Sequence, residues 1–172
     1  LSLYLLQETM FKFNSKQLTI DYGIDAYIIF PIAHNQKEFK FNNQIIKIQE
    51  KDFGESRITI NNLSLVDLND ADAQRAAKES RLIRETLNIY SRDKKPLLNF
   101  IKPVDGIISS RYGKKRFINN SPRSPHLALD IAAAEGTEII APADGQVVLT
   151  GNFFYGGNFI MIDHGHGMLT SY

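Results

Sequence analysis

Short runs of hydrophobic residues alternate with polar and turn-forming residues over positions 1–66. The runs are rich in β-branched and aromatic side chains, which favour strands, and Gly, Pro, Asn and Asp separate them. Asn42 and Asn43 stand between two alternating runs and indicate a hairpin turn. We expect strands over 18–20, 26–30, 39–41, 45–48 and 57–60. Residues 1–66 are therefore predicted to form a small antiparallel β domain.

After Asn69 the spacing of the hydrophobic residues changes to the three or four positions typical of a helix. This residue suits the N-cap position because its side chain can accept a hydrogen bond from the first turn, and Asp70 and Asp72 lie near the positive end of the helix. Small and apolar residues then recur every three or four positions, which predicts an amphipathic helix over 70–90. The recurring residues are Ala76, Ser80, Ile83, Leu87 and Tyr90.

Residues 67–99 as a whole are expected to be a helical connector that packs between two β domains, with its boundary at Pro96. The opposite face of the helix is predicted to be solvated, with a partner surface as the alternative. That face carries Arg75, Lys78, Glu79 and Arg81.

Beyond residue 100 the chain returns to short apolar runs punctuated by Gly and Asn. We expect strands over 107–109, 127–131, 138–140, 145–149 and 159–163. This pattern of short apolar runs is typical of an antiparallel all-β sheet domain. The fold class predicted for the whole chain is thus mainly β, with one connecting α-helix.

Composition narrows the class of protein. The 172 residues are 43% hydrophobic and 23% charged, as in ordinary globular proteins, and can form one domain or two small ones. The net charge of +1 argues against a nucleic-acid partner, and the basic run 114–116 is interpreted as a solvated turn. The absence of Cys excludes disulfides and thiolate metal ligands. The first apolar run, 3–6, is too short for a signal peptide or a membrane span, so we expect a leader to be missing in front of residue 1.

The residues with the most distinctive chemistry are His126 and Asp130, in an apolar run framed by Pro and Gly. Imidazole and carboxylate are ordinary zinc ligands. On an extended strand these two side chains would point to the same face, because their separation is even. A buried histidine paired with a carboxylate is the structural alternative. Other convincing ligand pairs are missing from the sequence, so we expect an incomplete metal site.

The short sequence motifs around this pair resemble the start of a lysostaphin/LytM-type zinc metallopeptidase domain, a family that cuts peptide bonds in bacterial peptidoglycan. The resemblance depends on the order and spacing of these motifs more than on any single motif. They occupy 103–113, 119–130, 136–147, 157–165 and 169–172. The resemblance covers roughly the last two-fifths of the chain and implies an incomplete peptidase domain over 100–172. The preceding segment more loosely resembles the amino-terminal β domain of Gram-negative members.

The resemblance implies that His126 and Asp130 are the first two zinc ligands. The family's third ligand is the second His of a His-x-His word, whose first His assists catalysis, and a further catalytic His follows a Tyr that aligns with Tyr172. All three histidines are therefore expected after Tyr172, which leaves no catalytic residue within this chain. Ala128 departs from the family pattern, which has Gly at that position.

Other polar residues admit two interpretations each. Arg123 is expected either to bind a substrate carboxylate or to tie down the ligand loop. The word containing His164 and His166 is predicted to be a structural turn rather than the catalytic His-x-His. Asn119 and Asn120 are expected to occupy a turn, with an amide oxygen near the metal as the alternative for either. The aromatic run 153–155 could line a groove or pack in the core.

The function implied by the resemblance is zinc-dependent hydrolysis of peptidoglycan stem or cross-link peptides by a periplasmic or secreted, envelope-associated enzyme, of which this chain is an inactive fragment. One alternative is a degenerate LytM-type domain that binds and activates another cell-wall hydrolase as its protein partner. A second is a structural β module. The amino-terminal domain is expected either to cover the substrate groove or to anchor the peptidase to a partner.

Overall fold

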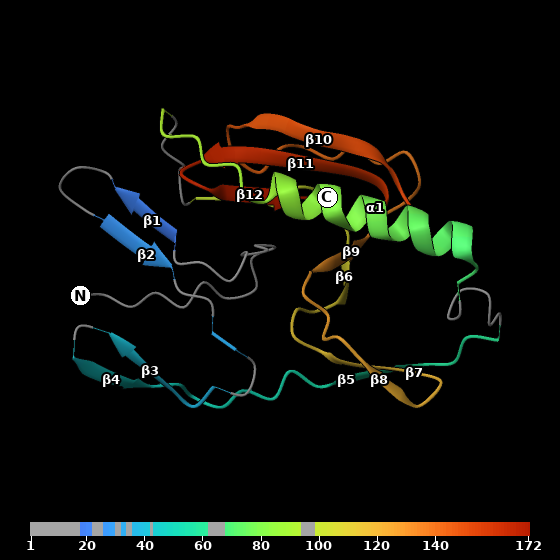
Figure 1. Cartoon of the computed structure of the whole chain (residues 1–172), viewed down its shortest axis with the longest axis horizontal. Helices are drawn as coiled ribbons and strands as arrows, with labels where there is room; N and C mark the ends of the chain where they lie inside the picture. Colours follow the sequence, from blue (N-terminus) through green and yellow to red (C-terminus); the bar gives the residue numbers. More distant parts are fainter. Residues whose placement is uncertain are drawn as a thin grey trace.

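The computed structural model describes residues 18–21, 26–29, 32–33, 36–41, 43–61, 68–93 and 99–172. Its described part is mainly β with one helix, which confirms the predicted fold class (Figure 1). The elements are β1 (Leu18–Asp21), β2 (Ala26–Ile29), β3 (Glu38–Phe41), β4 (Gln44–Lys47), β5 (Glu55–Ile58), α1 (Asp70–Thr86), β6 (Ile107–Ser110), β7 (Lys115–Ile118), β8 (Ser121–Arg123), β9 (Asp130–Ala132), β10 (Gln146–Phe153), β11 (Gly157–Gly165) and β12 (Met168–Ser171).

The amino-terminal strands form two separate antiparallel hairpins, β1–β2 and β3–β4. In the second, Phe41 pairs with Gln44 across the turn, and Asn43 has a left-handed backbone (φ 62°) that Asn tolerates well. This confirms the hairpin predicted from the sequence; Asn42 lies outside the described residues. The rings of Phe39 and Phe41 stack on one face, with centroids 6.4 Å apart.

The strand β5 pairs with β7 in a parallel ladder, and β7 pairs with β8 antiparallel. The result is a mixed three-stranded sheet, which we call the β5–β7–β8 ribbon. Parallel neighbours need a long crossover connection, and here α1 and β6 lie in that connection. The ribbon therefore joins residues from both sides of the helical connector, across the domain boundaries that the sequence suggests.

Asn119 extends the parallel pairing beyond the end of β7. Its N–H donates to the carbonyl of Ile58 at 3.0 Å. Its side-chain oxygen accepts from the N–H of Ile60 at 2.9 Å, and its side-chain nitrogen donates to the carbonyl of Ile60 at 3.1 Å. The amide thus replaces one more backbone rung of the ladder. The Asn119 amide is therefore engaged with the backbone of Ile60, in the turn expected at 119–120.

The helix α1 begins as predicted, because the Asn69 side chain accepts from the N–H of Asp72 at 2.9 Å. It ends at Thr86, four residues before the expected end. Polar side chains capture the carbonyls of the last turn: Thr86 donates to Leu82 at 2.8 Å, and Asn88 donates to Arg84 at 3.0 Å. Tyr90, predicted to be the last residue of the apolar face of the helix, lies beyond its end, and its ring stacks on His166.

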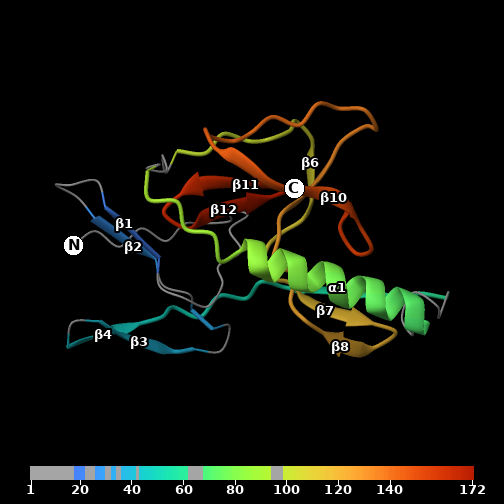
Figure 2. The same ribbon diagram turned by 45° about the horizontal axis from the view of Figure 1, so that its top comes forward.

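The charged face of α1 is not simply solvated, which corrects the prediction. Glu79 accepts a hydrogen bond from the N–H of Phe154 at 2.6 Å. Arg75 bonds Glu79 at 2.8 Å and donates to the carbonyl of Asn152 at 3.0 Å. These contacts fix the helix along the β10–β11 hairpin, and α1 lies against this sheet in both views (Figures 1 and 2).

The antiparallel sheet β10–β11–β12 contains most of the buried core. Its fully buried apolar side chains include Met161, Ile162, Met168 and Leu169. The strand predicted over 138–140 is not formed. Two hydrogen bonds still join this part of the chain to residues 101–103: the N–H of Ile140 donates to the carbonyl of Pro103 at 2.9 Å, and the N–H of Ile101 donates to the carbonyl of Pro142 at 3.0 Å. Neither proline has an N–H to add to this pairing. No described helix is long and apolar enough to cross a membrane.

We predict that Asn119→Ala lowers the free energy of unfolding by about 1–2 kcal/mol, because two hydrogen bonds to Ile60 are lost. Asn120→Ala is the matched control: Asn120 has the same left-handed backbone (φ 61° against 49°), and its side chain makes no such bonds within the described part of the chain. Urea denaturation of both variants measures the difference. Equal destabilisation would show that the Asn119 amide contributes nothing beyond its backbone.

We predict that acid loosens the docking of α1. The Phe154 N–H lowers the pKa of Glu79 from its ordinary 4.5, with Arg75 adding to the effect against an opposing influence of burial. A carboxyl whose folded pKa is lowered stabilises the fold above pH 4.5, and that contribution is lost as pH falls through the folded pKa. Glu79→Gln should therefore lower the melting temperature at pH 7 and flatten its decline on acidification. Glu85→Gln, exposed on the same helix, should leave both unchanged.

A candidate metal centre and its pocket

The main chain of His126 is held by the turn that precedes β7. Its N–H donates to the carbonyl of Lys114 at 2.9 Å, and its carbonyl accepts from the N–H of Gly113 at 2.7 Å. Gly113 has a positive φ of 88°, and a Cβ there would meet the Phe53 ring at 2.3 Å, so only glycine fits. The imidazole is buried, with the residue 5% exposed.

Asp130 begins β9, where it pairs with Ser110 of β6. Its Oδ2 atom lies 3.1 Å from Nε2 of His126, and its side chain is half-exposed. The structure thus brings the two predicted ligands together. The strand predicted over 127–131 is present only from residue 130, so the pair meets across a bend rather than along one strand face.

The two nitrogens of His126 have different surroundings. The Arg116 guanidinium contacts Nδ1, whereas the buried Nε2 has no hydrogen-bond partner, since the direction to Asp130 is poor for a hydrogen bond. Burial lowers the pKa of His126, the nearby Arg116 adds to this, and Asp130 opposes it. The histidine is therefore neutral near pH 7, which is the form that ligates metals.

The His126 nitrogen and the Asp130 carboxylate fit a zinc ion as ligands. The nitrogen is buried without a hydrogen bond, and it faces a carboxylate that is open to solvent on one side. One contact must change on binding. A guanidinium can only donate, so Nδ1 accepts and the proton of the neutral ring sits on Nε2. With zinc at Nε2 the ring proton would have to sit on Nδ1, and the Arg116 guanidinium would then need another acceptor. Within the described ranges, no group of three or more His, Asp or Glu side chains gathers for a metal.

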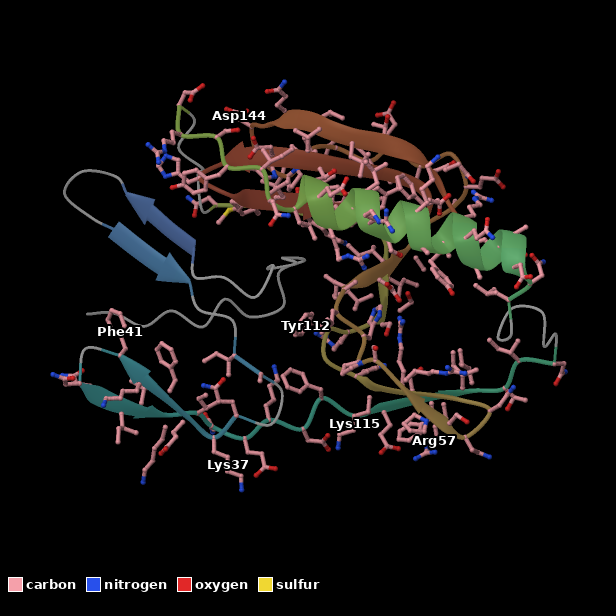
Figure 3. The ribbon with its side chains drawn as sticks, in the orientation of Figure 1. Lys37, Phe41, Arg57, Tyr112, Lys115 and Asp144 are labelled. Carbon is pink, nitrogen blue, oxygen red and sulfur yellow. The ribbon has the colours of Figure 1, made fainter. Side chains whose placement is uncertain are left out.

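A pocket of about 280 Å³ opens beside this pair. It lies between the β5–β7–β8 ribbon and the β6–β9 pair, which appear one above the other in Figure 3. The pocket is lined by Ser56, Ile58, Ser110, Arg116, Phe117, Ile118 and Asp130. Residues from before and after the helical connector therefore form one cavity.

Two basic residues of the ribbon lie near this pocket. Arg123, the predicted substrate contact, is exposed on β8 directly opposite Arg116 of β7. Arg116 itself was not foreseen, because the run 114–116 has the composition of a solvated turn. The structure corrects this, since Lys115–Ile118 is a strand. Residues 115–118 show no alternation of polar and apolar residues, so no local pattern marked this strand.

The segment containing His164 and His166 has a structural role, as predicted: His164 lies at the end of β11, and His166 lies in the turn that follows it. Nδ1 of His164 lies 2.7 Å from the carbonyl of Asp144, and Nε2 lies 2.8 Å from the Thr170 hydroxyl. The Asp163 carboxylate accepts from the hydroxyl of Ser91 at 2.5 Å. Nε2 of His166 lies 3.1 Å from the carbonyl of Arg92, so the turn binds the segment that follows α1.

The aromatic run 153–155 divides between two roles. Phe153 is buried and packs against Phe159, with ring centroids 5.0 Å apart, so it belongs to the core. Phe154 contacts Arg75 of α1 through its ring, whereas Tyr155 is 73% exposed. Tyr172, which aligns with the family's Tyr, extends the pairing of β12 through backbone hydrogen bonds to Ile160, and burial raises the pKa of its hydroxyl.

Comparison with known proteins agrees with this architecture. Residues 124–172 match the model of peptidase family M23. A peptidoglycan DD-endopeptidase, ShyA, from Vibrio cholerae is 38% identical over 73 residues, which are 41% of this chain and 17% of that protein. The murein hydrolase activator NlpD of Escherichia coli is 35% identical over 78 residues, 45% of this chain and 19% of the relative. The chain thus spans less than a fifth of each of these relatives.

A crystal structure described as a peptidase M23 from Pseudomonas aeruginosa has the same fold, with a TM-score of 0.52 at 23% identity. The match covers 92% of this chain and 52% of that one. The similarity of fold therefore reaches well beyond residues 124–172.

We predict that His164→Ala lowers the free energy of unfolding by about 1–3 kcal/mol, because the part-buried carbonyl of Asp144 and the buried hydroxyl of Thr170 lose their partner. Zinc affinity should not change, because both ring nitrogens already have structural partners. Urea denaturation and zinc titration give the two values. His126→Ala is the contrasting variant, and a comparable loss of zinc affinity in both would refute the structural assignment of His164.

Proposed function

The segment 124–172 belongs to peptidase family M23, and from this premise we propose that the chain is part of a zinc-dependent peptidoglycan endopeptidase. The substrate would be a stem or cross-link peptide of the cell wall. The observation that carries the proposal is the buried Nε2 of His126, which has no hydrogen bond and faces the Asp130 carboxylate beside an open pocket. The similarity to a DD-endopeptidase supports the reaction class.

His126 and Asp130 are the residues that would hold zinc. Bound zinc would polarise the scissile carbonyl and lower the pKa of a bound water to about 7. Catalytic zinc normally has three protein ligands, so a third donor must come from outside the described residues. The same holds for the general base and the group that stabilises the oxyanion. The proposed site of action is the periplasm or the cell exterior, since the relatives' names refer to peptidoglycan and murein.

The alternative function is activation of a separate cell-wall hydrolase. It is favoured by the similarity to a murein hydrolase activator and by the contact of Arg116 with the proposed zinc ligand. Ala128, where the family has Gly, also favours the activator function. Under this alternative the partner is the hydrolase, and zinc is dispensable.

We predict that His126→Ala and Asp130→Asn in the full-length protein abolish cleavage of peptidoglycan in a zymogram, because each removes a proposed metal ligand. Bound zinc, measured by metal analysis after dialysis, should fall in parallel. Melting curves control for folding, and Asp105→Asn, an exposed carboxylate distant in sequence, controls for lost charge.

Cleavage at the wild-type level by either His126→Ala or Asp130→Asn would refute the proposal that the protein is a zinc-dependent peptidase. Zinc-independent stimulation of a purified hydrolase by both variants would establish the activator function instead.

A further inference from the structure

The two faces of the β5–β7–β8 ribbon carry different chemistry. In register across the strands, Ser56 pairs with Arg116, and Arg116 pairs with Arg123. Residues directly opposite one another point to the same face. Ser56 and Arg116 line the pocket, so this row faces the candidate metal centre. We call Ser56, Arg116 and Arg123 the inner row.

On the outer face, Glu55 offsets part of the positive charge. Arg57 bonds Glu55 at 2.9 Å and lies over the Phe117 ring, 3.9 Å from its centroid. Lys115 is in register with Glu55. Arg57 and Lys115 lie on the side of the ribbon away from β6 and β9 (Figure 3). Arg57 thus has both an acidic and an aromatic partner from the ribbon itself.

The inner row has no such balance. Two like charges directly opposite each other destabilise a pair of strands. Within the described residues, no carboxylate lies within ion-pair distance of Arg116 or Arg123, and the carboxylate that lines the pocket, Asp130, faces Nε2 of His126 at 3.1 Å. Arg116 uses one terminal nitrogen toward His126, which leaves its other donors for a ligand. An anion between the two guanidinium groups would offset their repulsion.

We propose that the inner row is a carboxylate-binding subsite, which recognises a free carboxylate of an acidic peptide substrate. Paired guanidinium groups match the two oxygens of a carboxylate, and the Ser56 hydroxyl adds a third donor. The subsite rests on the proposed function for the identity of its substrate. It also gives the segment before α1 a direct part in binding, because β5 supplies Ser56.

The test compares two neutral variants of the same ribbon in the full-length protein. Arg123→Gln removes an inner-row charge from an exposed position, and Arg57→Gln removes an equally exposed charge from the outer face. The probes are N-acetyl-trialanine with a free carboxylate and the same peptide as its terminal amide. Dissociation constants come from NMR titration.

The wild type should bind the acid about tenfold or more tightly than the amide, since hydrogen bonds to charged groups are the strong ones. Arg123→Gln should lose most of this preference, and Arg57→Gln should keep it. Rising salt should weaken binding of the acid only. Equal binding of acid and amide by the wild type, or an equal loss in both variants, would overturn the subsite.

Peptidoglycan cleavage is assayed separately to distinguish the two proposals. Cleavage without preference for the acid refutes the subsite and leaves the peptidase function standing. Selective binding of the acid without cleavage supports the subsite and refutes the peptidase function.

Discussion

The parallel pairing of β5 with β7 is the constraint on which the candidate site depends. β7 places Arg116 against His126, and the turn before β7 holds the main chain of His126 through Lys114 and Gly113. Without β5, β7 and β8 would be an isolated two-stranded hairpin, which is marginally stable in water. The ladder also brings Ser56 and Ile58 to the pocket wall. A strand from before the connector therefore supports both the metal pair and the proposed subsite.

A second set of contacts stabilises the other side of the molecule without touching the site. Glu79 and Arg75 bind the β10–β11 hairpin, and Ser91 and Arg92 bind Asp163 and His166 at the end of β11. These contacts hold α1 and the residues that directly follow it along the β10–β11–β12 core.

How far the sequence predicted this structure depends on the range of each interaction. The N-cap at Asn69 and the hairpin at Asn43 follow from residues within a few positions of each other, and both were predicted. The β5–β7 ladder joins residues about sixty positions apart and leaves no local pattern. Arg116 resembled a solvated residue for the same reason, since its partner His126 comes from another segment. His126 and Asp130 could be predicted because they and the motifs around them are close together in the sequence. That the two side chains approach each other across a bend, and not along one strand, was not predicted.

The measurement that tests the central claim most directly is native-state hydrogen exchange of the ribbon. If β5 supports the site, the amides of Ile60, Lys115 and Asn119, each bonded across the β5–β7 boundary, should open together with one free energy. The amide of His126, bonded to Lys114, should share that opening. A protected His126 amide, with the amides of Ile60, Lys115 and Asn119 exchanging freely, would show that the site stands without β5 and would contradict the account.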